Sequence, residues 1–237
     1  MRKYLITALM ILLFLGVKAQ NTPASIPQAS FTTDSNEVVY DEQGNALRYY
    51  QYAKMLSSGN YTLRSDGQPG APGTKRSLVK LTPELRARVY KSIKPMLTIS
   101  SGPLAEGSTL DISALLKHLK LDNLDGKALV LVFWAADCSP CTGAFSTLND
   151  YFKETDVVTM AITADGKGVA ERQLKETPLT ATYLLNNAGK VFGSYGVFKW
   201  PTYIVTDRAH VIKFALAGNS PFIIPAMGDA IKEVAVK

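Results

Sequence analysis

An uninterrupted apolar run covers residues 129–134, Leu-Val-Leu-Val-Phe-Trp. A short run that is apolar throughout and rich in valine and aromatic residues favours a strand that is buried on both faces. After Cys141 the pattern changes to that of a helix, because Phe145, Leu148 and Phe152 recur at spacings of three and four. The chain therefore predicts a central strand that gives way to a helix shortly before Cys141.

The rest of the C-terminal part alternates between strand and helix patterns. Expected strands cover residues 157–163, 180–185, 203–206 and 211–216. Expected helices cover residues 111–121, 169–176, 190–195 and 221–236. This order, which closes on a β-hairpin and a final helix, predicts an α/β domain over residues 102–237, with a mixed central sheet and helices on both faces.

The preceding residues, 20–101, form a separate N-terminal region of unknown role. Helices are expected over residues 46–56 and from Pro83 to about Ile93, with the second one ending near Pro95. Short strands are expected around Val39 and over residues 77–81, on either side of a Gly- and Pro-rich loop. The pattern predicts a smaller, mainly helical region with little core of its own.

The first 19 residues have the features of a secretory signal peptide. Arg2 and Lys3 precede a short apolar run, and Ala19 offers a small residue for cleavage. A membrane anchor is the alternative, but the run is shorter than the ~20 apolar residues that a span needs. We expect a periplasmic or otherwise exported protein with no stable membrane insertion after cleavage.

The charge pattern argues against a nucleic-acid partner. The formal net charge is +6, and cleavage after Ala19 would lower it to +3 by removing three basic residues and no acidic one. The remaining Lys and Arg residues alternate with acidic residues instead of clustering, so the sequence predicts no basic patch of the kind that binds nucleic acid.

The sequence contains two cysteines, Cys138 and Cys141, and both lie at the predicted junction of strand and helix. A helix N-terminus presents unpaired N–H groups and a partial positive charge, which favour a reactive thiolate at Cys138. The alternative is half of a zinc site, which would need two more ligands. His118 and His210 belong to other segments and are expected to be exposed, so no metal site and no cofactor are predicted.

The combination resembles the thioredoxin superfamily, and within it the TlpA/ResA type of exported thiol–disulfide oxidoreductase. The resemblance runs from Leu104 to the C-terminus. It rests on Phe133-Trp134-Ala135, Cys138-Ser139-Pro140-Cys141 and Trp200-Pro201-Thr202, and on Asp125-Gly126-Lys127 and Tyr195-Gly196-Val197 for the TlpA/ResA type. In this family the later proline is cis and packs beside the cysteines.

The resemblance implies a reaction and the residues that carry it. Cys138 would attack a disulfide as the nucleophile, and Cys141 would resolve the mixed disulfide, so that the pair cycles through a Cys138–Cys141 disulfide. The implied partners are protein thiols and disulfides, together with an upstream electron donor such as a membrane thiol carrier. The residues expected to bind substrate are Trp134, Ser139, Pro140, Trp200 and Pro201.

Three positions depart from the family's pattern. Val132 stands where thioredoxins carry a buried Asp, and Ala144 stands where ResA-type proteins carry a Glu. Asp137 precedes the first cysteine, where its charge would oppose the helix end by raising the thiol pKa. The alternatives are that Asp137 serves as the missing acid–base group or is a solvated loop residue. Two alternative functions therefore stay open: a non-catalytic thioredoxin-fold binding or assembly module, and a dithiol oxidant.

Overall fold

The computed structural model describes residues 37–68, 71, 73–121, 123–153 and 156–235. The expected signal peptide and the leader that follows it lie outside these residues. Within the described ranges the chain forms two β-sheets, one of four and one of five strands. None of the helices in these ranges is long and apolar enough to cross a membrane.

The five-stranded sheet has the strand order β7-β6-β5-β8-β9. Its strands are β5 (Leu129–Trp134), β6 (Val158–Thr163), β7 (Tyr183–Leu185), β8 (Thr202–Thr206) and β9 (Ile212–Ala217). β5, β6 and β7 run parallel to one another, whereas β8 and β9 form an antiparallel hairpin beside β5. The mixed sheet that the sequence predicts is confirmed, with β5 at its centre.

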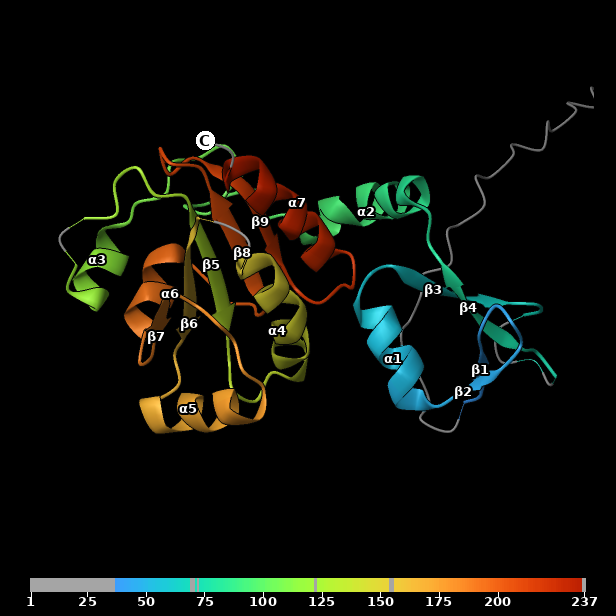
Figure 1. Ribbon diagram of the computed structural model, residues 1–237. Coiled ribbons are helices and arrows are strands. Elements are labelled where there is room, and N and C mark those ends of the chain that lie inside the picture. The colour runs from blue at the N-terminus through green and yellow to red at the C-terminus, as the bar shows by residue number, and fades with distance from the viewer. Residues whose placement is uncertain (1–36, 69–70, 72, 122, 154–155, 236–237) are drawn as a thin grey trace, which may run out of the picture. The chain divides into compact units, whose positions relative to one another are not determined.

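Helices cover both faces of this sheet (Figure 1). The helices are α3 (Ser113–Leu119), α4 (Ser139–Phe152), α5 (Lys167–Glu176), α6 (Gly189–Tyr195) and α7 (Ile223–Ala235). Successive side chains of a strand point to opposite faces. Val130, Val132 and Trp134 accordingly pack in one apolar cluster with α4 and α7. Leu129, Leu131 and Phe133 pack in a second cluster with α3 and α6, so β5 is buried on both sides.

The outer strand β9 is paired along its free side by the segment that leads into α3. The Ile99 amide donates to the Ala215 carbonyl over 3.0 Å, and the Gly107 amide donates to the Ile212 carbonyl over 2.8 Å. Isolated bridges at Thr98 and Thr109 extend this pairing. Residues 98–110 therefore occupy one edge of the sheet.

His210 lies in the hairpin turn but is buried, with 8% of its surface exposed. Its Nε2 atom is 3.2 Å from the carbonyl oxygen of Leu124, and its backbone is left-handed with φ 60°. The prediction of an exposed histidine is wrong, because the turn packs against the loop that precedes β5. This loop lies 86 positions away in the sequence.

The N-terminal region contains the two expected helices, and a four-stranded sheet as well. Its elements are β1 (Val39–Tyr40), β2 (Ala46–Leu47), α1 (Tyr49–Ser57), β3 (Tyr61–Ser65), β4 (Arg76–Lys80) and α2 (Pro83–Leu97). The strand order is β2-β1-β4-β3. A small core unites Val39, Tyr52, Leu56 and Leu78. The first helix starts three residues later than expected, because Ala46 and Leu47 pair with β1 instead.

Helix α2 continues through Pro95 to Leu97, so the expected end before this proline is wrong. A proline inside a helix removes one N–H donor and crowds the preceding turn. Here it lies only two residues from the helix end, and the Thr98 amide still donates to the Lys94 carbonyl over 2.9 Å. The N-terminus of α2 is capped by a hydrogen bond from the Leu85 amide to the Thr82 hydroxyl.

Asp207 organises the hairpin turn between β8 and β9. One carboxylate oxygen accepts hydrogen bonds of 2.9 Å from the amides of Ala209 and Val211, and the other lies 3.0 Å from the Lys213 ammonium. Burial acts to raise the pKa of Asp207, but these hydrogen bonds and the Lys213 charge outweigh it and hold the pKa below the ordinary value of 3.8. The ionised carboxylate therefore stabilises the folded state.

We expect Asp207→Asn to lower the free energy of unfolding at pH 7. A carboxyl group whose pKa is lowered by folding contributes stability above its unfolded pKa and loses it as pH falls through the folded pKa. The difference between wild type and variant should therefore shrink as the pH falls below about 4. Urea unfolding from pH 7 down to pH 2.5 measures this, and a pH-independent difference would contradict it.

Candidate active site

The two cysteines lie where β5 ends and α4 begins. Cys138 is the N-cap residue of α4 and Cys141 lies in its first turn. A β-turn leads into the helix, because the Cys138 amide donates to the Ala135 carbonyl over 3.2 Å. Pro140 occupies the first turn, where its missing N–H has no helical partner to lose. The junction predicted from the apolar and helical patterns is thus present.

The cysteines form a disulfide, with their Cα atoms 5.2 Å apart. Cys138 keeps 8% of its surface exposed, whereas Cys141 is fully buried. Cys138 is therefore the more accessible of the two cysteines. This asymmetry fits an attacking residue at position 138 and a resolving residue at position 141.

The polar surroundings of Cys138 favour negative charge on its sulfur. The Cys141 amide donates to Cys138 Sγ over 3.2 Å, as an N-cap hydrogen bond. The first turn of α4 carries no acidic residue, so the positive end of the helix dipole is unopposed within the helix. Asp137 is exposed to solvent, where water screens its charge.

The Pro201 loop lies at the same edge of the sheet as the cysteines. In the antiparallel pairing of β5 and β8, Phe133 lies opposite Thr202, which brings Pro201 level with Trp134. The Trp200–Pro201 peptide bond is cis, and the Pro201 carbonyl accepts a 2.7 Å hydrogen bond from the Gly218 amide. Pro201 is buried, whereas Trp200 exposes 44% of its surface.

The residues expected to bind substrate differ in exposure. Ser139 and Pro140 are exposed beside Cys138, and Trp200 is exposed at the neighbouring loop. Trp134 is fully buried and packs edge-on against Phe145, with ring centroids 5.3 Å apart. The expectation that Trp134 contacts substrate is therefore wrong. Its position in a strand buried on both faces makes it a core residue.

The two positions that lack the family's carboxylates, Val132 and Ala144, also lie in apolar surroundings in the structure. Val132 is 1% exposed, and Ala144 packs against the same apolar cluster. The cross-strand partner of Val132 is Tyr203, which is 2% exposed. Burial raises the pKa of Tyr203 above its ordinary value of 10.0, so this phenol stays protonated where thiols titrate.

Asp165 was not among the predicted site residues, and it falls between the strand expected over residues 157–163 and the helix expected over residues 169–176. The residue follows β6, and its carboxylate accepts a 2.7 Å hydrogen bond from the Ala136 amide, two positions before Cys138. The sequence did contain a signal for this contact, because Asp165 follows a buried strand next to β5. The carboxyl ends of neighbouring parallel strands lie at the same edge of a sheet, so the residues after these two strands lie close together.

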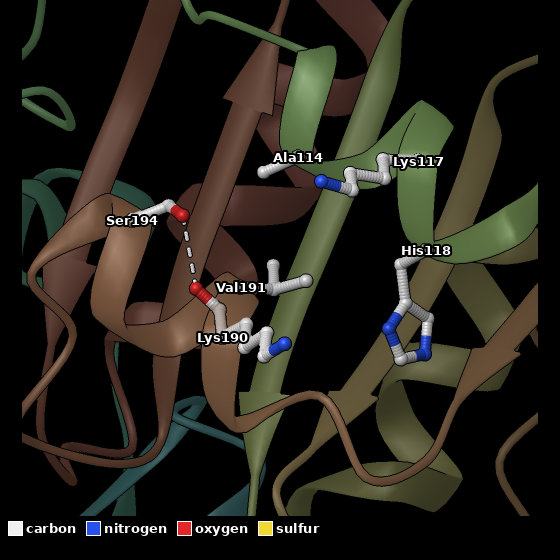
Figure 2. Close-up of a pocket in the computed structure, with 6 residues that line it drawn as sticks. All are labelled: Ala114, Lys117, His118, Lys190, Val191 and Ser194. Carbon is white, nitrogen blue, oxygen red and sulfur yellow. Dashed lines mark hydrogen bonds between the residues drawn. The ribbon is translucent and has the colours of Figure 1, made fainter.

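A separate recess of about 390 Å³ lies between α3 and α6 (Figure 2). Its lining residues are Ala114, Lys117, His118, Lys190, Val191 and Ser194. The Ser194 hydroxyl turns back to donate to the Lys190 carbonyl over 2.9 Å. His118 is half-buried at this recess instead of fully solvated. Neither cysteine contributes to the recess, so it is not the site of thiol chemistry.

Residues 106–215 match the AhpC/TSA family. Over 96 residues the chain is 28% identical to the thiol-disulfide oxidoreductase ResA of Bacillus thuringiensis. The aligned residues cover 39% of this chain and 56% of that protein. The ResA of Oceanobacillus iheyensis is 31% identical over 98 residues, which cover 39% of this chain and 51% of that protein. The chain thus spans about half the length of these curated relatives. Among solved structures, StoA from Bacillus subtilis shows a TM-score of 0.39 with 16% identity, covering 45% of this chain and 84% of StoA.

Proposed function

Because residues 106–215 match the AhpC/TSA family and the chain is similar to ResA proteins, we propose that the protein is a thiol–disulfide oxidoreductase of the TlpA/ResA type. One observation carries the proposal. The first cysteine of a Cys-x-x-Cys pair caps α4 and keeps 8% of its surface exposed, whereas the second is fully buried and joined to the first by a disulfide. This difference in exposure fits a Cys138 that reacts with substrate and a Cys141 that reacts only with Cys138.

The reaction starts from the reduced pair. The Cys138 thiolate attacks one sulfur of a substrate disulfide, the substrate S–S bond breaks, and a mixed disulfide forms while the leaving thiolate takes up a proton. Cys141 then loses its proton and attacks Cys138 Sγ, which releases the second substrate thiol. Two electrons have passed to the substrate, and the protein is left with the Cys138–Cys141 disulfide. A donor dithiol restores the reduced pair by the reverse exchange.

The proposed substrates are disulfides of other exported proteins, and the proposed donor is an upstream thiol carrier. Export rests on the signal-peptide pattern of residues 1–19. Substrate contact is proposed for Ser139 and Pro140, which are exposed next to Cys138 in the sequence, and for Trp200 and Pro201 of the loop before β8. The exposed indole of Trp200 offers an apolar surface to a substrate chain.

The reduction potential of the cysteine pair tests both the reaction and its direction. We expect a value near that of reducing thioredoxins, about −270 mV, in a glutathione or dithiothreitol redox series with the mature protein. A value near about −120 mV, typical of a strong dithiol oxidant, would reverse the proposed direction. If no Cys138–Cys141 disulfide forms at any redox potential in the series, the proposed reaction is wrong and the non-catalytic binding module takes its place as the proposed function.

A further inference from the structure

Asp165 lies in the turn after β6, the strand next to the one that leads into the active-site loop. β5 and β6 are parallel, with Trp134 paired to Thr163, so both strands end at the same edge of the sheet. The loop after β5, residues 135–137, leads to Cys138. The turn after β6 brings the half-buried Asp165 against this loop.

The carboxylate of Asp165 is held in one position by short hydrogen bonds. Oδ2 accepts from the Ala136 amide over 2.7 Å and from the Thr163 hydroxyl over 2.8 Å. The Thr163 oxygen in turn accepts from the Asp165 amide over 3.1 Å, and Thr163 is fully buried. The Asp165 carbonyl accepts from the Asn187 amide over 2.8 Å. Both the backbone and the side chain of Asp165 are therefore fixed.

The bond to Ala136 joins this fixed carboxylate to the loop that places the nucleophile. A hydrogen bond to an ionised acceptor is stronger than one between neutral groups. In the oxidised protein the Cys138–Cys141 bond also holds the loop. Reduction removes this covalent link, and the position of Cys138 then depends on non-covalent contacts.

We infer that Asp165 is a positioning residue, whose carboxylate keeps Cys138 at the N-terminus of α4 when the disulfide is reduced. This inference rests on the proposed function. Asp165 acts through the Ala136 amide and takes no part in the thiol exchange itself.

The test compares Asp165→Ala with Asp165→Asn. Both variants lack the carboxylate charge, but the Asn oxygen can still accept both hydrogen bonds, so the difference between them reports position alone. The measurements are the pKa of the Cys138 thiol, from thiolate absorbance at 240 nm, and the rate constant of the reduced protein with oxidised glutathione. We expect Asp165→Ala to react about tenfold more slowly than Asp165→Asn, equivalent to about 1.4 kcal/mol in the barrier. We also expect it to have a higher thiol pKa.

Asp207→Ala is the matched control. It removes another carboxylate that accepts two hydrogen bonds, here from two backbone amides in the hairpin turn that follows β8. We expect wild-type values for both measurements in this variant. Thr163→Val provides a second variant, which keeps Asp165 but removes the hydroxyl that orients it, and should lower the rate about threefold.

Equal rates and equal thiol pKa values in Asp165→Ala and Asp165→Asn would overturn the inference, as would an equal loss in Asp207→Ala. If Asp165→Ala does not fold, Thr163→Val decides, and a wild-type rate there counts against the role of Asp165. Failure of the proposed function gives a different result. The wild type would then not react with oxidised glutathione, while the thiol pKa would still report whether Asp165 positions Cys138.

Discussion

Cys138→Ser should abolish disulfide reduction, with a loss on the order of a thousandfold or more in the rate of insulin reduction. The variant removes the sulfur of the cysteine that keeps 8% of its surface exposed, and the fully buried Cys141 cannot replace it. Cys141→Ser should behave differently, because attack can proceed but resolution cannot. It should accumulate a mixed disulfide with substrate, visible as a reducible mass increase.

A thiol placed elsewhere on the same helix controls for the mere presence of a cysteine. Ser146 is an exposed residue of α4, and Ser146→Cys in the Cys138→Ser background should not restore activity. Such a thiol is far from the positive end of the helix and has no resolving partner one turn away. Full activity of Cys138→Ser would instead support the non-catalytic binding module, since a scaffold does not need the thiol.

Phe145→Ala should lower the free energy of unfolding by about 3–5 kcal/mol. Phe145 projects from α4, is 1% exposed and packs edge-on against Trp134. Its removal leaves a cavity between the helix that carries the cysteines and the central strand. Because a typical domain is stable by only about 5–15 kcal/mol, urea unfolding should show a large shift of the midpoint.

The neighbouring Ser146→Ala variant is the control for Phe145→Ala. It lies on the same helix but is exposed, and a surface substitution of this kind changes stability by about 0.5 kcal/mol or less. A loss below about 1 kcal/mol for Phe145→Ala would mean that the ring does not belong to the core that joins α4 to the sheet.

The part of the fold that depends on local patterns was predictable. The apolar run of β5 and the three-four spacing after Cys141 are each contained in a short stretch of sequence, and both elements were located from them. The same pattern also contained the evidence against a surface role for Trp134. A strand buried on both faces leaves none of its side chains for a substrate.

The features that were missed depend on partners far along the chain. Burial of His210 requires the carbonyl of Leu124, and the role of Asp165 requires the Ala136 amide, 29 positions earlier. The four-stranded sheet of the N-terminal region was predicted only in part, since strands were expected at β1 and β4 but not at β3 or at the two-residue β2. Such short strands carry almost no periodic signal and are defined by their pairing.

The pairing of residues 98–110 along β9 has a consequence for contact with other chains. An outer strand with free amide and carbonyl groups is a template on which another chain can add as a strand, which leads to aggregation. On the β9 side of the sheet, residues 98–110 already pair with these backbone groups. On the opposite side β7 has only three residues, which leaves little length for an intermolecular ladder. In its proposed role, the domain can therefore meet partly unfolded chains without recruiting their strands into its own sheet.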